Sequence, residues 1–142
     1  MSFDDDLSIG KHYEMEVLRK IQQRYPLAYC VDGYCKDWDI YVPELEIGVE
    51  VKSDQKSKYT GNIVVEFEYN HKPSALATTK ASYWVFFDGD VYSWFTPQII
   101  KTCITDNGLD YYIFKGNGDE HYKKAYLINK EMLFGYALQI ND

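Results

Sequence analysis

The sequence predicts an α/β (α+β) fold with a mixed central β-sheet flanked by helices. A helical pattern comes first, several short alternating strand patterns follow, and two further helical patterns lie later in the chain. With 142 residues, 46% of them hydrophobic, the chain is long enough for one substantial core, and no linker or repeat divides it. We therefore expect a single domain over residues 1–142, of which residues 1–8 form a flexible tail.

The first expected element is a helix from about Gly10 to Tyr25, ended by Pro26. Its apolar face comprises Tyr13, Val17, Leu18 and Ile21. Glu14 projects from that apolar side, where an ionised group needs a partner or a metal ion. Glu16 instead aligns with Lys20 at i,i+4 as an ordinary surface pair.

Strand patterns alternate with turn residues over the middle of the chain. After a short strand and turn near Asp32-Gly33, we expect the strands WDIYVPE, IGVEVKS and NIVVEFEY, the first two as partners around Pro43. Residues 70–81 are expected as a loop with a short helix after Pro73. SYWVFF and VYSWF flank Asp88-Gly89-Asp90, which indicates a hairpin.

The C-terminal part predicts two strands and two helices. Thr96 is expected to cap the helix PQIIKTCIT, whose first residue is Pro97 and which ends at Asn107-Gly108. The strand DYYIF, the turn GNGDE, the strand KAYLIN and an amphipathic helix around KEMLFGYAL complete the chain.

Composition limits the function classes. The net charge of −7 argues against a broad phosphate-binding surface, because neutralising many phosphates takes Lys and Arg. It does not exclude a nuclease, since a divalent-metal site concentrates carboxylates. Cys30, Cys35 and Cys103 lack zinc-ligand spacing and are interpreted as reduced structural residues. No apolar run reaches the ~20 residues that cross a bilayer, and MSFDDD lacks the basic region of a signal peptide, so a soluble cytoplasmic protein without a membrane partner is expected.

The alternation of side chains along two strands predicts that three polar residues lie close together. In IGVEVKS, Glu50 and Lys52 share one face of the strand, while Val49 and Val51 point into the apolar layer. If WDIYVPE pairs antiparallel with this strand, Asp39 comes beside Glu50 and Lys52. Two carboxylates and an amine then converge at one end of a sheet.

This cluster suits metal-assisted phosphodiester hydrolysis. Two carboxylates hold Mg²⁺, the metal acidifies a water molecule, and a neighbouring lysine orients that water or stabilises the oxyanion. Asp37 competes with Asp39 for the ligand role, and Asp39 is preferred because the apolar Ile40 and Val42 follow it in register. The solvated face of an ordinary strand remains the alternative, because the spacing D-x10-E-x-K is common by chance.

The segment from Gly10 to about Val85 resembles the PD-(D/E)XK nuclease superfamily, which has the restriction-endonuclease-like fold. The matching pieces are GKHYEMEVL, KDWDIYV and GVEVKSD. The continuation TGNIVVEFEY, followed by KPSALATTKASYWVFF, is similar to small phage-type and mobile-element-type members. Trp38 stands where the superfamily name has proline, and Ala75 stands where those members have glycine.

The resemblance implies a set of site residues. Asp39 and Glu50 would bind Mg²⁺, for which Mn²⁺ would substitute, and the backbone carbonyl of Val51 would be a third ligand. Lys52 would be the catalytic lysine. Glu14 would be the helix carboxylate that assists the metal or its water.

Further candidates surround this set. Glu66 matches the glutamate of the following strand in the family. The alternative, in which Glu66 and Glu68 simply face solvent, has almost equal weight. Trp84 and Trp94 are interpreted as core residues rather than as base-stacking platforms. The candidate substrate-binding residues, with turn, cap or solvent roles as open alternatives, are Lys56, Lys58, Tyr59, Lys72, Ser74, Thr78, Thr79 and Lys80.

The expected function is a Mg²⁺-dependent DNA endonuclease that acts on branched or structured DNA, similar to a Holliday-junction resolvase. RNA stays open as a substrate, a homodimer would allow two strands to be cut, and a phage-encoded protein would act in the host cytoplasm. A non-catalytic nuclease-fold module that binds a partner in a nucleic-acid-processing complex is the alternative. An acidic inhibitor that mimics DNA is a third, weaker hypothesis.

Overall fold

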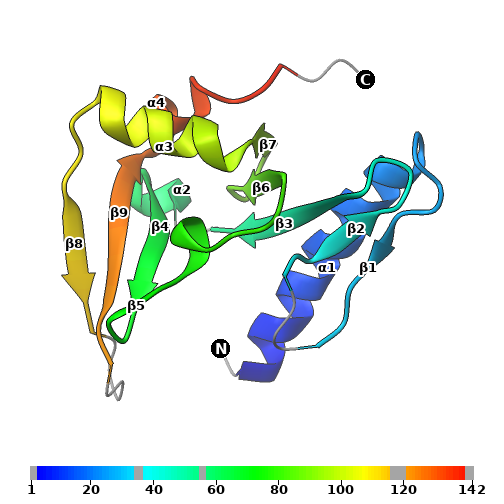
Figure 1. Cartoon of the computed structure of the whole chain (residues 1–142), viewed down its shortest axis with the longest axis horizontal. Coiled ribbons are helices and arrows are strands. Elements are labelled where there is room, and N and C mark those ends of the chain that lie inside the picture. Colours follow the sequence, from blue (N-terminus) through cyan, green and yellow to red (C-terminus); the bar gives the residue numbers. More distant parts are fainter. Residues whose placement is uncertain (1–2, 34–36, 55–56, 116–120, 140–142) are drawn as a thin grey trace.

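The computed structural model describes residues 3–33, 37–54, 57–115 and 121–139, with side chains from residue 10 onward (Figure 1). These residues form two β-sheets with helices around them. Sheet A has the strand order β1-β2-β3-β6-β7, with β1 Tyr29–Cys30, β2 Ile40–Val42, β3 Ile47–Ser53, β6 Tyr83–Phe87 and β7 Tyr92–Phe95. Sheet B has the order β5-β4-β9-β8, with β4 Asn62–Tyr69, β5 Lys72–Pro73, β8 Tyr111–Phe114 and β9 Lys123–Asn129.

Helices cover these sheets on different sides. They are α1 Phe3–Gln22, α2 Ser57–Thr60, the 3-10 helix η1 Ala75–Ala77, α3 Pro97–Asp106 and α4 Lys130–Phe134. In Figure 1, sheet B stands on the left with α3 across its upper end, and β1 to β3 lie on the right against α1. Within the described ranges, no helix is both long and apolar enough to cross a membrane.

The first helix starts earlier than the sequence predicts. It begins at Phe3 rather than near Gly10, so residues 3–8 extend this helix. It ends at Gln22, and the predicted apolar face is confirmed by the burial of Val17 and Leu18 against sheet A.

The β-structure departs from the single central sheet that the sequence predicts. The predicted antiparallel pairing of β2 with β3 is confirmed, but the other neighbour of β3 is β6, which runs parallel to it. β4 lies in sheet B, where it pairs with β9. Ile63 and Val65 of β4 are buried in one core together with Trp84 of β6, so burial of these side chains favours stacking of the second sheet on the first. The coarser prediction of a mixed α and β domain is confirmed.

Local signals predict most other elements correctly. The hairpin β6–β7 forms around Asp88-Gly89-Asp90, and the Thr96 side chain accepts the N–H of Ile99 at the start of α3. The final helix is shorter than expected, because α4 ends at Phe134. α2 and β5 were not predicted from the sequence. The predicted turn GNGDE and Cys35 lie outside the described residues.

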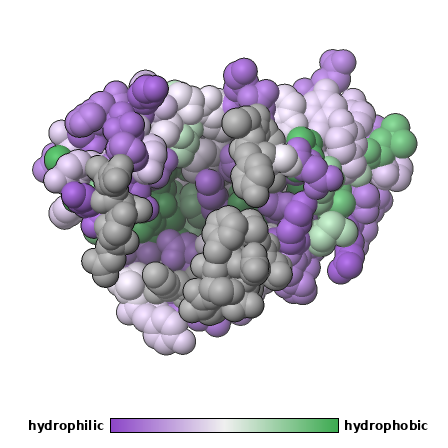
Figure 2. All heavy atoms as spheres, turned by 90° about the horizontal axis from the view of Figure 1, so that it is seen from below, coloured by the Kyte–Doolittle hydropathy of each residue, from purple (hydrophilic) through white to green (hydrophobic). Residues whose placement is uncertain are grey.

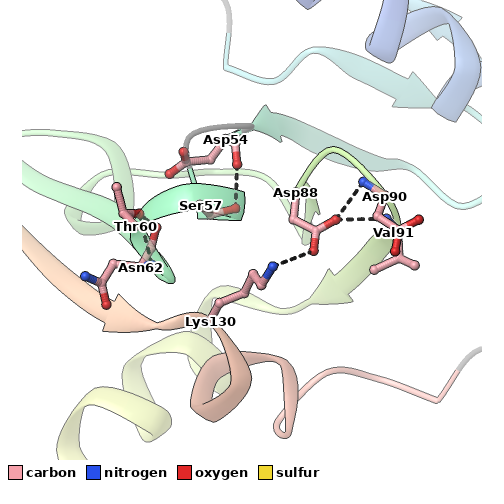
Figure 3. A network of polar contacts seen from close by, with 8 residues as sticks. All are labelled: Asp54, Ser57, Thr60, Asn62, Asp88, Asp90, Val91 and Lys130. Carbon is pink, nitrogen blue, oxygen red and sulfur yellow. Dashed lines mark hydrogen bonds and ion pairs between the residues drawn. The ribbon is translucent and has the colours of Figure 1, made fainter.

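A polar network joins the two sheets where β3 and β6 end (Figure 3). Asp88 is buried, its Oδ1 accepts the N–H groups of Asp90 and Val91 at 2.9 and 2.8 Å, and its Oδ2 lies 3.2 Å from Lys130 Nζ. The carbonyl oxygen of Asp54 accepts the Ser57 hydroxyl at 2.6 Å. Because Lys130 begins α4 directly after β9, the Asp88–Lys130 ion pair connects the β6–β7 turn of sheet A with sheet B.

We predict that Asp88→Asn lowers the free energy of unfolding by about 2 kcal/mol at neutral pH, because it removes a charge-assisted contact from a buried site. Burial raises the pKa of Asp88, but the two N–H groups and Lys130 outweigh it and hold that pKa below its ordinary 3.8. The carboxylate therefore stabilises the fold above about pH 4, and this contribution is lost as the pH falls through the lowered pKa. Denaturant unfolding across this pH range measures the effect.

Asp90→Asn is the matched control, because Asp90 is an exposed aspartate in the same turn. Its free energy of unfolding should stay within about 0.5 kcal/mol of the unmodified chain at every pH. Equal losses for the two variants, or a loss for Asp88→Asn that persists at low pH, would contradict the role given to Asp88.

Candidate active site

Asp39 lies just before β2 and contacts β3 on both sides of Glu50. Its side chain is 5% exposed. The Asp39 N–H donates to the Val49 carbonyl oxygen at 3.0 Å, and its Oδ2 accepts the Val51 N–H at 2.8 Å. The Asp39 carboxylate is therefore fixed against the peptide that links Glu50 to Val51.

Glu50 and Lys52 occupy the face of β3 that turns away from α1. Val49 packs in the core that α1 covers, so the alternation along the strand places Glu50 and Lys52 on the opposite face. Glu50 is the cross-strand partner of Trp84, and Lys52 Nζ lies 5.4 Å from the centroid of the Trp84 ring. Both polar side chains are half-buried, so this face is the edge of an apolar layer rather than a fully solvated surface.

Two tryptophans give this face its shape. Trp84 is buried, as predicted for a core residue, and its indole N–H donates to Thr79 Oγ1 at 3.0 Å. Trp38 packs over Gly48, where a Cβ atom would overlap its ring, and stacks on Tyr41 with ring centroids 5.4 Å apart. This packing was not predicted from the sequence, although a glycine inside a strand is a signal of a close approach by another group.

An open pocket lies beside Trp38. Its volume is about 610 Å³ and its lining is Tyr29, Val31, Asp32, Gly33, Asp37, Trp38 and Tyr41. Figure 2 shows mostly hydrophilic side chains on the underside of the molecule, with hydrophobic ones visible where the surface is hollowed between its left and right halves. Two of the lining residues, Asp37 and Trp38, directly precede Asp39 in the sequence. Neither Glu50 nor Lys52 lines the pocket.

Glu14 belongs to a different side of sheet A. It projects from α1, as predicted, and its side chain is 13% exposed with Oε2 3.9 Å from Lys11 Nζ. Because α1 covers the Val49 face of β3, Glu14 and Lys52 lie on opposite faces of the sheet.

Glu16 makes contacts that the sequence analysis did not foresee. Instead of being only a surface partner for Lys20, it accepts a hydrogen bond from the Tyr92 hydroxyl, and its Oε1 lies 3.1 Å from His12 Nε2. Burial of the Tyr92 hydroxyl and its bond to Glu16 raise the pKa of Tyr92. Glu16 thus ties α1 to the edge strand β7, a contact between residues far apart in the sequence.

Several candidate residues have internal partners. Glu66 lies in sheet B, where its Oε2 accepts the Ser74 hydroxyl at 2.8 Å. Lys80 Nζ lies 3.6 Å from Asp37, the exposed competitor of Asp39. Thr79 accepts from Trp84 and from the Ala81 N–H, which is a structural role.

The other substrate candidates in the described part of the chain are exposed, and these are Lys58, Tyr59, Lys72 and Thr78. Of these, Lys58 packs along Gly89 in the β6–β7 turn, and Lys72 lies on the edge strand β5. Lys56 lies outside the described residues.

The donor set fits a magnesium ion in part. In the described part of the chain, no three or more His, Cys, Asp or Glu side chains come close enough together to hold a metal ion. Mg²⁺ needs fewer protein ligands, because it keeps several waters and binds through one or two carboxylates together with substrate phosphates. Asp39, just before β2, and Glu50, on the paired strand β3, supply two such carboxylates, whereas Glu66 lies in sheet B.

Comparisons with known proteins return no match: no family model, no curated protein and no solved structure matches the chain. The resemblance of GVEVKSD and its neighbours to the nuclease superfamily therefore stays a hypothesis. Function has to be inferred from the chain's own residues.

We predict that Gly48→Ala destabilises the fold by about 1–3 kcal/mol, because the added methyl group would overlap the Trp38 ring and displace it from its stack with Tyr41. Near-UV circular dichroism and denaturant unfolding measure both effects. Gly10→Ala is the control, since a Cβ there meets nothing within 4 Å and alanine favours the helix by about 0.5–1 kcal/mol. A stable Gly48→Ala chain with an unchanged aromatic spectrum would show that the ring does not rest on this glycine.

Proposed function

We propose that the chain is a Mg²⁺-dependent phosphodiesterase, a DNA endonuclease whose active-site residues are Asp39, Glu50 and Lys52. The observation that supports this most is the bond from the Val51 N–H to Asp39 Oδ2. It fixes the Asp39 carboxylate at the peptide between Glu50 and Val51, one residue before Lys52. Asp39 is thereby held beside the strand that carries Glu50 and Lys52.

Each residue has a defined part in this proposal. Asp39 and Glu50 hold the metal, which when bound supplies an acidified water and neutralises charge on the phosphate. Asp39 keeps one oxygen engaged with Val51, so its carboxylate enters the reaction already oriented. Lys52 places its ammonium beside the phosphate, where it orients the attacking water and stabilises the developing negative charge.

Glu14 takes a supporting part. Its side chain is nearly buried on the α1 side of sheet A and lies near Lys11. We assign Glu14 to positioning of the metal's water rather than to the group that touches the phosphate.

The substrate proposal follows from charge and size. A single domain with a net charge of −7 has little basic surface for long duplex DNA. Branched or structured DNA presents a local shape that a small domain recognises with few phosphate contacts.

A second candidate function is a non-catalytic binding module with the same fold. The ion pair of Lys80 with Asp37 and the bond of Glu66 to Ser74 favour it, since these residues serve internal packing instead of a substrate. Such a module would bind its partner without any metal. Metal binding therefore separates the two functions.

We predict that Glu50→Gln and Lys52→Ala each lower Mg²⁺-dependent cleavage of a four-way-junction DNA by about a hundredfold or more, because each removes a group that acts on the phosphate or its metal. The assay also includes flap, duplex and single-stranded DNA. Asp39→Asn should lose activity to a similar extent while its amide oxygen retains the bond to Val51.

Asp37→Asn and Lys101→Ala are the matched controls, because they remove the same charges from exposed positions outside the proposed site. Both should cleave at nearly the unmodified rate. Cleavage at the full rate by folded Glu50→Gln and Lys52→Ala chains would rule out the proposed active site.

We predict that calorimetric titration with Mn²⁺ detects one binding event that Asp39→Asn weakens by about tenfold or more, since one of two carboxylate ligands is lost. Asp37→Asn should bind Mn²⁺ like the unmodified chain. Absence of any Mn²⁺ binding, with cleavage also absent, would instead support the non-catalytic module.

A further inference from the structure

The edge strand β8 presents an apolar surface to solvent. It is the last strand of sheet B and pairs only with β9 in the described part of the chain. Tyr111, Tyr112 and Ile113 are 47, 55 and 59% exposed. The strand therefore offers unpaired backbone groups together with three large exposed side chains.

Apart from its shortness, β8 has no feature within its four residues that would prevent another strand from pairing with it. Natural edge strands are protected by charged side chains, proline or a bulge, because an open edge is a template for another strand. The sequence YYIF of β8 contains no charge and no proline, and its ladder with β9 is regular over all four residues. An open edge of this kind is typical of a surface that another strand covers.

The charges at the two ends of β8 indicate which strand covers its free edge. Asp110 precedes the strand and Lys115 follows it, and both are exposed. When two copies of β8 pair antiparallel about a two-fold axis, the acidic start of each strand lies near the basic end of the other. Parallel pairing would instead bring like charges together.

We propose that a second copy of this chain pairs with β8 along its free edge in the antiparallel sense. The contact is isologous, so the same strand serves both copies and the assembly closes as a dimer. The two B sheets then form one continuous sheet, and the exposed tyrosine and isoleucine side chains are covered by their counterparts. This inference does not depend on the proposed nuclease function.

The area buried in this contact is small, so the dimer is expected to be weak. Four residues per strand bury less area than the ~800 Å² per partner of a standard stable interface. We therefore expect a dimer in reversible exchange with the monomer, with a dissociation constant roughly in the micromolar range or weaker.

Sedimentation velocity of the full chain over about a hundredfold range of concentration tests the proposal. The unmodified chain should shift from monomer toward dimer, and hydrogen exchange at the β8 amides should slow as the concentration rises. Ile113→Lys should remain monomeric at all concentrations, because it places a charge in the middle of the edge. Val64→Lys is the matched control, since Val64 is also an exposed apolar residue of sheet B but lies on the interior strand β4.

A charge exchange tests the antiparallel arrangement. Asp110→Lys and Lys115→Asp should each weaken the dimer, because each creates two repulsive contacts about the two-fold axis. An equimolar mixture of the two variants should dimerise again, since every acidic end then meets a basic end. Circular dichroism of each variant first establishes that it is folded.

Three outcomes would overturn the proposal. The first is an unmodified chain that stays monomeric at every concentration. The strand that pairs with β8 would then belong to another protein. The second is equal dimerisation of the Ile113→Lys and unmodified chains. The third is a mixture of the charge variants that associates no better than either variant alone.

Discussion

The rest of the structure depends on the burial of β6 on both of its faces. Val85 is fully buried in the core beneath α1, whereas Trp84 and Phe86 are buried in the core shared with sheet B. Alternate residues of a strand point to opposite sides, so β6 fits only as an interior strand between two apolar layers. Its parallel pairing with β3 imposes the same two environments on that strand.

The proposed active site follows from this pairing. Val49 joins Val85 on the α1 side, so Glu50 and Lys52 must lie on the side of Trp84. At that position they border an apolar layer, where charges interact more strongly than in water because the local dielectric is lower. The bond from the Val51 N–H to Asp39 then fixes a second carboxylate at the same point. Core packing and site geometry thus have a common cause.

Sequence reasoning succeeded where the structure is determined locally. Alternation in IGVEVKS predicted the face of Glu50 and Lys52, and the Asp88-Gly89-Asp90 turn predicted its hairpin. The membership of β4 in a second sheet could not be predicted, because the alternation in NIVVEFEY is the same whichever strand it pairs with. The Glu16–Tyr92 hydrogen bond joins residues 76 positions apart and leaves no local signal. Long-range packing decided these features.

Internal contacts also limit how this domain could hold DNA. Lys80 is paired with Asp37, Thr79 accepts from the Trp84 indole, and Ser74 donates to Glu66, so these candidates are already engaged. Lys52 is the cation of the proposed site, and its Nζ lies 5.4 Å from the centroid of the Trp84 ring. A surface with few phosphate-binding cations gives an affinity that changes little with salt, because few counterions are released on binding. If the chain is a nuclease, the shape of its substrate and the bound metal must therefore supply most of the selectivity, and Lys52 acts on the reacting phosphate rather than on the affinity for DNA.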